Sequence, residues 1–154
     1  MKKYVVLFLL ILMSMSVLPQ SAPAKEKTRA VVMPVGGTLT TEEKSVLEAR
    51  LARLFDGRYT IISGAEVNAY AAKVLREENQ KEDCDLQKCY TRIAAQFNAE
   101  VLIAFKPLRK DETAIVATLV VYDVIDGRDI LRKTADCDHC TVDKLEKLME
   151  QMSR

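Results

Sequence analysis

Four cysteines, arranged as two close pairs, are the residues of this chain whose chemistry is most specific. Cys84 and Cys89 are separated by four residues, and Cys137 and Cys140 by two. In an oxidising compartment, an even number of cysteines in a small domain indicates disulfides, whereas in the cytosol these spacings indicate metal or redox chemistry. We therefore predict that all four cysteines form disulfides, provided that the chain is exported.

The spacing leaves the connectivity of these disulfides open. Local bridges would join Cys84 to Cys89 and Cys137 to Cys140, and each would stabilise the fold by about 2–3 kcal/mol. Bridges between the two segments would close loops of roughly 50 residues and would stabilise rather more on the same entropy model. We expect both pairs at one end of a sheet, because the helix that begins near Cys84 should run antiparallel to the strand after it.

Two other uses of the cysteines also stay open. Four thiolates at these spacings fall within the range of structural zinc sites, although an oxidising compartment argues against zinc. Cys137 and Cys140 precede a predicted helix, where the helix dipole lowers a thiol pKa, and His139 between them would help a redox pair. The motif follows the last strand, however, which is not the order of elements in thioredoxin.

No other set of residues points to catalysis. His139 is the only histidine, so a Ser-His-Asp or Cys-His arrangement would have to use it, and we interpret it as a solvated loop residue. Gly-Gly at 36–37 lacks the Gly-Lys-Ser/Thr of a phosphate loop. Lys106, Arg109 and Lys110 are interpreted as the polar edge of a hairpin tip. We predict no catalytic residue, no metal site and no cofactor, and hence no enzyme.

The amino-terminal segment decides the compartment. Residues 1–24 begin with positive charge, continue with an apolar run at 5–17 and end in Ala-Pro-Ala, which are the three parts of a secretory signal. The apolar run of about 13 residues is shorter than the roughly 18–20 that span a bilayer. We predict a Sec-type signal cleaved after Ala24, a periplasmic destination in a bacterium, and no membrane span after cleavage.

The rest of the chain suits one domain with one core. Residues 25–29 are predicted to form a frayed start, and residues 30–152 a single domain. Without the leader, the chain has 21 basic and 22 acidic residues, a net charge of −1. A nearly neutral chain gives no electrostatic reason to expect nucleic acid or an anionic membrane as partner.

Hydrophobic patterning predicts the elements that would position these residues. Thr40 and Glu43 have the spacing of a helix capping box, and Asp126-Gly127 is a strong hairpin signal. Strands are predicted at 30–35, 58–62, 100–108, 113–123 and 128–135, and helices at about 41–56, 64–75, 85–97 and 142–152.

The order β-α-β-α-α-β-β-β-α predicts an α/β fold of mixed α+β type. The early β-α-β unit implies parallel strands joined by a right-handed crossover, and the last three strands form an antiparallel meander. We therefore expect a single mixed five-stranded sheet with helices packed on it.

Several segments are together similar to a known domain. Leu-Thr-x-Glu occupies 39–42 after the first strand, Gly-Arg-Tyr-Thr-Ile-Ile-Ser occupies 57–63, and Tyr-Asp-Val-Ile-Asp-Gly occupies 122–127. Over most of residues 30–150 the chain resembles the α/β domain shared by the amino-terminal part of TolB and the periplasmic core of CsgG-like proteins. The resemblance implies an envelope module that binds or assembles with other proteins and has no active site. The lipid-anchor cysteine of CsgG-like lipoproteins and the propeller of TolB are missing, so the functions of those systems do not carry over.

These observations predict a secreted, non-enzymatic protein-interaction or assembly module of the bacterial cell envelope, stabilised by disulfides. Its partner would be an envelope protein, contacted through the sheet edges or the cysteine-bearing end. The alternative is a periplasmic thiol-disulfide redox protein that uses Cys137 and Cys140. Thiol titration under a mild reductant separates the two, because structural bridges resist reduction and a catalytic pair opens readily.

Overall fold

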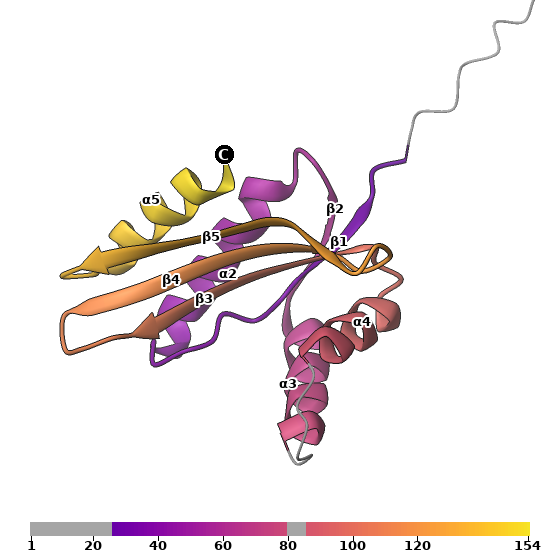
Figure 1. Cartoon of the computed structure of the whole chain (residues 1–154), viewed down its shortest axis with the longest axis horizontal. Coiled ribbons are helices and arrows are strands. Elements are labelled where there is room, and N and C mark those ends of the chain that lie inside the picture. Colours follow the sequence, from indigo (N-terminus) through magenta and orange to yellow (C-terminus); the bar gives the residue numbers. More distant parts are fainter. Residues whose placement is uncertain (1–25, 80–85) are drawn as a thin grey trace, which may run out of the picture.

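A five-stranded mixed sheet, with helices on both faces, forms the centre of the molecule (Figure 1). The computed structural model describes residues 26–79 and 86–154, so the predicted leader lies outside the described residues. The strands are β1 (Arg29–Val32), β2 (Thr60–Ile62), β3 (Val101–Arg109), β4 (Ala114–Asp123) and β5 (Arg128–Asp138). The helices are α2 (Thr41–Phe55), α3 (Ala65–Asn79), α4 (Leu86–Gln96) and α5 (Val142–Ser153).

The sheet order is β2-β1-β3-β4-β5. Strand β1 pairs in parallel with both β2 and β3, while β3, β4 and β5 form the antiparallel meander. The predicted fold class, element order and mixed sheet are therefore confirmed. Strand β1 begins at Arg29, the last residue of the segment predicted as a frayed start, and its carbonyl accepts a hydrogen bond from the Glu100 amide at 3.0 Å.

Local chemistry explains where the first elements begin and end. Pro34 has no N–H for the ladder, and the Val35 amide donates instead to the Glu48 carboxylate at 2.9 Å, so the chain leaves the sheet after Met33. Helix α2 then starts at the predicted capping box. The Thr40 hydroxyl accepts from the Glu43 amide, and the Glu43 carboxylate accepts from the Thr40 amide at 2.7 Å.

The sheet separates two hydrophobic cores. Because side chains alternate along a strand, Ile103 and Phe105 face α2 and α5, whereas Leu102 and Ala104 face α3 and α4. This explains why β3 reads as a continuous apolar run.

The two faces are covered unequally. Helices α2 and α5 lie along the long strands, whereas α3 and α4 lie together at one end, near the β4–β5 turn (Figure 1). Beyond α4, the second face of β3, β4 and β5 has no helix over it in the described chain. We call this surface the open face; it is formed by Leu108, Val116, Thr118, Thr134 and Asp136, which the strand register places side by side.

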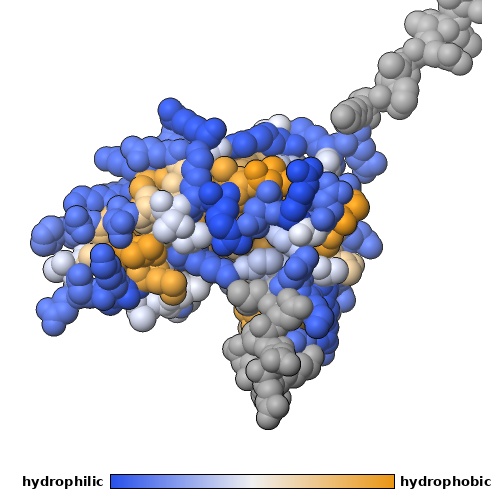
Figure 2. All heavy atoms as spheres, in the orientation of Figure 1, coloured by the Kyte–Doolittle hydropathy of each residue, from blue (hydrophilic) through white to orange (hydrophobic). Residues whose placement is uncertain are grey.

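The exposure of the open face confirms that no described helix packs on it. Leu108 is 61% exposed, Thr134 and Asp136 are exposed, and Val116 and Thr118 are half-buried. Figure 2 shows hydrophobic residues among hydrophilic ones over the part of the long strands that extends away from α3 and α4.

Candidate functional site

The cysteine pair at the end of β5 forms a disulfide. Cys137 and Cys140 are joined, with their Cα atoms 5.4 Å apart. Cys137 is buried in the core beneath α2 and α5, and the Cys140 amide donates to the Thr113 carbonyl at 3.3 Å. The chain then enters α5, whose first turn is capped by the Thr141 hydroxyl. The bridge thus ties the end of β5 to the start of α5, and this is the local pairing.

The other predicted pair is only half described. Cys84 lies outside the described residues, and Cys89 is fully buried in the core between the sheet and helices α3 and α4. A bridge between Cys84 and Cys89 therefore stays a prediction.

The prediction that both cysteine pairs share one end of the sheet is wrong for Cys89, the described member of its pair. Helix α4 starts near the β4–β5 turn, where the Gln87 side-chain amide donates to the Gly127 carbonyl at 3.4 Å. Cys137 lies at the opposite end of the β4–β5 hairpin, and its core is on the opposite face from that of Cys89. The reason is that α4 packs against the hairpin turn instead of running along β3. This separation is incompatible with a bridge from Cys89 to Cys137 or Cys140, and with a zinc site that includes Cys89 and that pair.

The remaining sequence candidates do not converge. His139 is exposed at the tip of the disulfide loop, with a left-handed φ of 47°. Within the described ranges 26–79 and 86–154, no three His, Cys, Asp or Glu side chains lie close enough together to hold a metal ion.

A groove that the sequence did not predict lies between α4 and strands β3 to β5. It consists of two adjoining cavities that share Tyr90 and Lys106. The first cavity, of about 290 Å³, is polar, and the second, of about 170 Å³, is mainly apolar. The polar cavity is lined by Gln87, Tyr90, Lys106, Tyr122, Gly127, Arg128, Asp129 and Arg132. Apolar residues around the second cavity are Met33, Pro34, Leu75, Ala104, Pro107 and Leu108.

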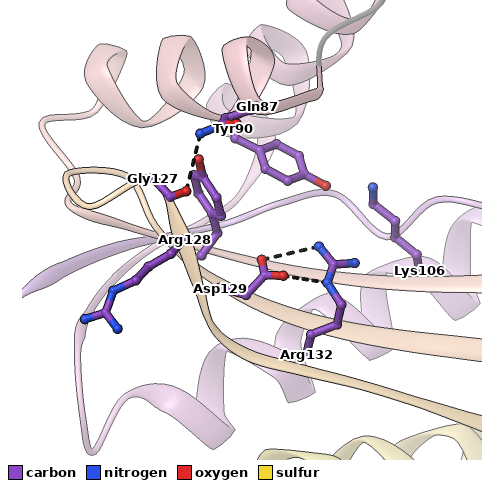
Figure 3. A pocket seen from close by; sticks show the side chains of 8 residues that line it. Gln87, Tyr90, Lys106, Gly127, Arg128, Asp129 and Arg132 are labelled. Atoms are coloured by element: carbon purple, nitrogen blue, oxygen red, sulfur yellow. Dashed lines mark hydrogen bonds and ion pairs between the residues drawn. The ribbon is translucent and has the colours of Figure 1, made fainter.

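An aromatic wall separates the two cavities. The Tyr90 ring packs edge-on against Tyr122, with centroids 5.7 Å apart, and each tyrosine is only 6% exposed. The Lys106 ammonium lies 5.3 Å from the Tyr90 ring centroid, a favourable cation–π distance. Figure 3 shows Tyr90 reaching from α4 toward Lys106 on β3. The wall therefore holds the lysine charge where both cavities meet.

The loop after β1 closes the far side of the apolar cavity. Gly37 there has a φ of +86°, and a Cβ at this position would overlap the Pro107 carbonyl oxygen. A side chain is therefore excluded at Gly37 by both backbone conformation and space. Of the two glycines, it is Gly37 that allows this close approach to β3.

Charges in the polar cavity are neutralised in pairs, except for one. Arg132 donates two hydrogen bonds to Asp129, at 2.6 and 3.3 Å, and these raise the pKa of Arg132 above its usual value. Arg128 pairs with Asp126 at 3.1 Å and extends away from the other lining residues (Figure 3). In the described chain, no carboxylate lies within ion-pair distance of Lys106. Lys106 therefore leaves the cavity with an excess of positive charge.

The Tyr122 hydroxyl is the second unusual group in this cavity. It is buried and has no hydrogen-bond partner in the described part of the chain. Leaving such a group unpaired costs about 1–3 kcal/mol. Buried polar groups are nearly always paired, so this hydroxyl in the lining of the cavity is available to an atom that enters the cavity.

One sequence signal could have revealed the groove. Lys106 is the only charged residue in the run 101–108. Its nearness in sequence to Arg109 and Lys110 favours the interpretation as part of a hairpin tip. The register instead places it opposite Thr118, well inside the β3–β4 ladder. A single charge within an otherwise apolar strand therefore indicates a site better than the charges of Arg109 and Lys110 at the turn do.

The described chain is thus an α+β domain whose mixed sheet carries a groove at one end of a partly uncovered face. Its fold is similar to that of PelC from Paraburkholderia phytofirmans, solved as a dodecamer. The TM-score is 0.51 at 13% identity, over 86% of this chain and 91% of PelC. At this identity the likeness shows a shared fold alone.

Two further solved structures have lower scores. The LpoB carboxy-terminal domain from Salmonella enterica has a TM-score of 0.48 at 14% identity, over 76% of this chain and 87% of that domain. TolB from Acinetobacter baumannii has a TM-score of 0.48 at 10% identity, over 81% of this chain and 27% of TolB. At these scores neither match carries an argument, and the resemblance to CsgG-like proteins stays a prediction. No family model and no curated protein matches the chain.

Within the described ranges, no helix has the length and apolar character needed to cross a bilayer.

Proposed function

We propose that this chain is a non-enzymatic protein-binding domain of the bacterial cell envelope, exported by its leader and stabilised by disulfides. The observation that carries the proposal is the open face, a sheet surface that continues into the groove beside α4. A sheet with one partly uncovered face offers a preformed surface to a partner at little ordering cost. The proposal includes removal of residues 1–24, which lie outside the described residues.

The edge of the sheet supports the same function. Strand β5, Arg128–Asp138, is an edge strand of 11 residues, next to β4 on one side only. A free strand edge can pair with an extended segment of another chain. Ile130, at the register irregularity of this strand, is 50% exposed. The partner could be a second copy, an arrangement for which the dodecameric PelC of similar fold offers a precedent.

The redox alternative has less support. Cys137 is only 8% exposed and belongs to the core beneath α2 and α5. A thiol-disulfide catalyst presents an accessible, activated sulfur to its substrate. A bridge with one sulfur in the core is better suited to holding β5 and α5 together.

Site-specific photo-crosslinking in the bacterium of origin tests the proposal. A benzoylphenylalanine in place of Thr134 reports on the open face, and one in place of Lys147, exposed on α5, is the matched control. We expect position 134 to give discrete adducts with an envelope protein or a second copy, and position 147 to give none. The absence of adducts at position 134 of the mature chain would contradict the proposal. So would a chain that keeps residues 1–24 and stays in the cytoplasm.

A further inference from the structure

We propose that the groove binds an extended peptide segment that presents a carboxylate next to an aliphatic side chain. This inference deepens the proposed protein-binding function and rests on it. It assigns the polar cavity to the carboxylate and the apolar cavity to the aliphatic side chain, with Lys106 between them.

The charge balance of the groove selects an anionic group. The two aspartates near the polar cavity, Asp126 and Asp129, are each paired with an arginine. Lys106 is held at the Tyr90 ring without a carboxylate partner in the described chain. An incoming carboxylate would therefore meet one positive charge that no described acidic side chain opposes.

The Tyr122 hydroxyl supplies a second, independent indication. It is nine-tenths buried, unpaired in the described chain, and part of the lining of the polar cavity. A phenol O–H can donate to a carboxylate oxygen, and such charge-assisted bonds are about twice as strong as neutral ones. A bound carboxylate would satisfy a hydroxyl that the described fold leaves without a partner.

The composition of the site favours a carboxylate over a phosphate. Phosphate recognition typically uses bidentate arginine or several backbone amides at a helix start. The positive charges of both arginines in the cavity are balanced, because Arg132 donates two bonds to Asp129 and Arg128 pairs with Asp126. One lysine and one phenol match the single charge of a carboxylate.

The apolar cavity indicates that the ligand carries a side chain as well as a charge. Its volume of about 170 Å³ exceeds the roughly 150 Å³ of an engineered protein cavity that takes up benzene. Met33, Leu75 and Leu108 contribute to its lining, so an aliphatic group would be buried there. An extended peptide repeats its side chains on one face about every 7 Å. We therefore expect the acidic and aliphatic residues to be two positions apart.

Binding of a set of short peptides to the oxidised mature chain tests this inference. The probes are acetylated, amidated heptapeptides with one Leu and one Glu, separated by one to four positions, and the same set with Gln for Glu. Fluorescence polarisation should show the tightest binding for the pair two positions apart, with the Gln peptides at least about tenfold weaker. That ratio is what loss of one charge-assisted bond produces.

Variants identify the groups responsible. Lys106→Met should weaken the Glu peptide at least about tenfold and remove the preference for Glu over Gln. Tyr122→Phe, which also removes one charge-assisted bond, should weaken it about tenfold while the protein stays folded. Lys147→Met, a matched charge removal on α5, should leave the affinity within twofold of the unmodified chain.

Three outcomes would overturn the inference. The first is that no peptide of the set binds below about 1 mM. The second is that Glu and Gln peptides bind equally well. The third is that phosphatidylglycerol vesicles compete with the Glu peptide for the unmodified chain and do not bind the Lys106→Met chain. That result would assign the groove to a lipid headgroup.

The crosslinking at position 134 keeps this test separate from the proposed function. If adducts at 134 persist in Lys106→Met and no peptide of the set binds, the groove assignment is refuted and the protein-binding function is not. Absence of both adducts and peptide binding would refute the protein-binding function as well.

Discussion

The two faces of the sheet are covered in different ways. On one face, α2 and α5 bury residues such as Phe55, Leu145 and Met149, each at most 1% exposed. On the other, α3 and α4 cover only the end near the β4–β5 turn, and Leu108 on the open face is 61% exposed. The first face maximises burial, whereas the second keeps part of a rigid strand surface accessible.

Polar contacts follow the same division. Helices α2 and α5 are joined by the Arg50–Glu150 ion pair at 3.0 Å, and Arg58 donates to the Ser153 carbonyl at 2.7 Å. The groove on the other face holds the unpaired Tyr122 hydroxyl and the unopposed Lys106 charge. We call the face covered by α2 and α5 the closed face. Its polar contacts are paired, whereas the groove on the other face keeps an unpaired hydroxyl and an unopposed charge.

Removing the same side chain from each face should break this comparison most clearly. Leu145→Ala on the closed face should lower the free energy of unfolding by about 3 kcal/mol, because it leaves a cavity in a dense core. Leu108→Ala on the open face should change it by less than about 0.5 kcal/mol, because little apolar area is lost from burial. Urea unfolding followed by circular dichroism measures both, and equal losses would show that the open face is covered.

Reduction of the Cys137–Cys140 bridge should give the next largest effect. On the chain-entropy model, a bridge across so short a loop stabilises the fold by about 2 kcal/mol. We expect the oxidised chain to resist a mild reductant when native and to lose about that free energy of unfolding once reduced. Rapid reduction of the native chain under the mild condition, without a loss of stability, would instead favour the redox alternative.

Much of the fold could be predicted because local sequence decides it. The capping box of Thr40 and Glu43 starts α2 as predicted, and the hairpin signal at Asp126-Gly127 does turn the chain, with Gly127 at a φ of +66°. The Asp123 carboxylate supports that turn by accepting from the Ile125 and Asp126 amides, each at 2.9 Å. Each of these devices acts within a few residues, so the sequence alone reveals it.

The site could not be predicted because it depends on where α4 packs. Periodicity indicates that Cys89, Tyr90 and Ile93 face inward, and all three are buried, but it does not say which part of the sheet they meet. The edge contact between Tyr90 and Tyr122 places α4 at the hairpin turn. The packing of α4 at this position forms the groove and places Cys89 far from Cys137.

The unpaired hydroxyl of Tyr122 in the groove should make removal of this polar atom stabilising, unlike removal of atoms from an ordinary core residue. Tyr122→Phe removes a buried polar atom that has no partner in the described chain, so it should raise the free energy of unfolding by up to about 1 kcal/mol. Thermal unfolding measures the change, with Tyr59→Phe, a half-buried tyrosine beside Phe55, as the control. A loss of stability in Tyr122→Phe would show that the hydroxyl is satisfied within the protein.

The smallest expected effect distinguishes two carboxylates by pH, one on α5 and one in the β3–β4 turn. Hydrogen bonds from Arg154 and the nearby Arg50 lower the pKa of Glu150, on the closed face, below its reference of 4.5. Backbone N–H groups of Thr113 and Ala114 lower the pKa of Asp111, in the β3–β4 turn, below its reference of 3.8. A carboxyl with a lowered folded pKa stabilises the fold above its unfolded pKa, and this contribution is lost as the pH falls through the folded value.

The stability advantage of the unmodified chain over Glu150→Gln should therefore begin to shrink near pH 4.5, and that over Asp111→Asn only near pH 3.8. Urea titrations between pH 7 and pH 2.5 give the two curves, which should be flat above pH 6. The contribution of Glu150 would then begin to fall at a higher pH than that of Asp111. A difference that grows on acidification would mean that these hydrogen bonds do not favour the ionised carboxylates in the folded chain.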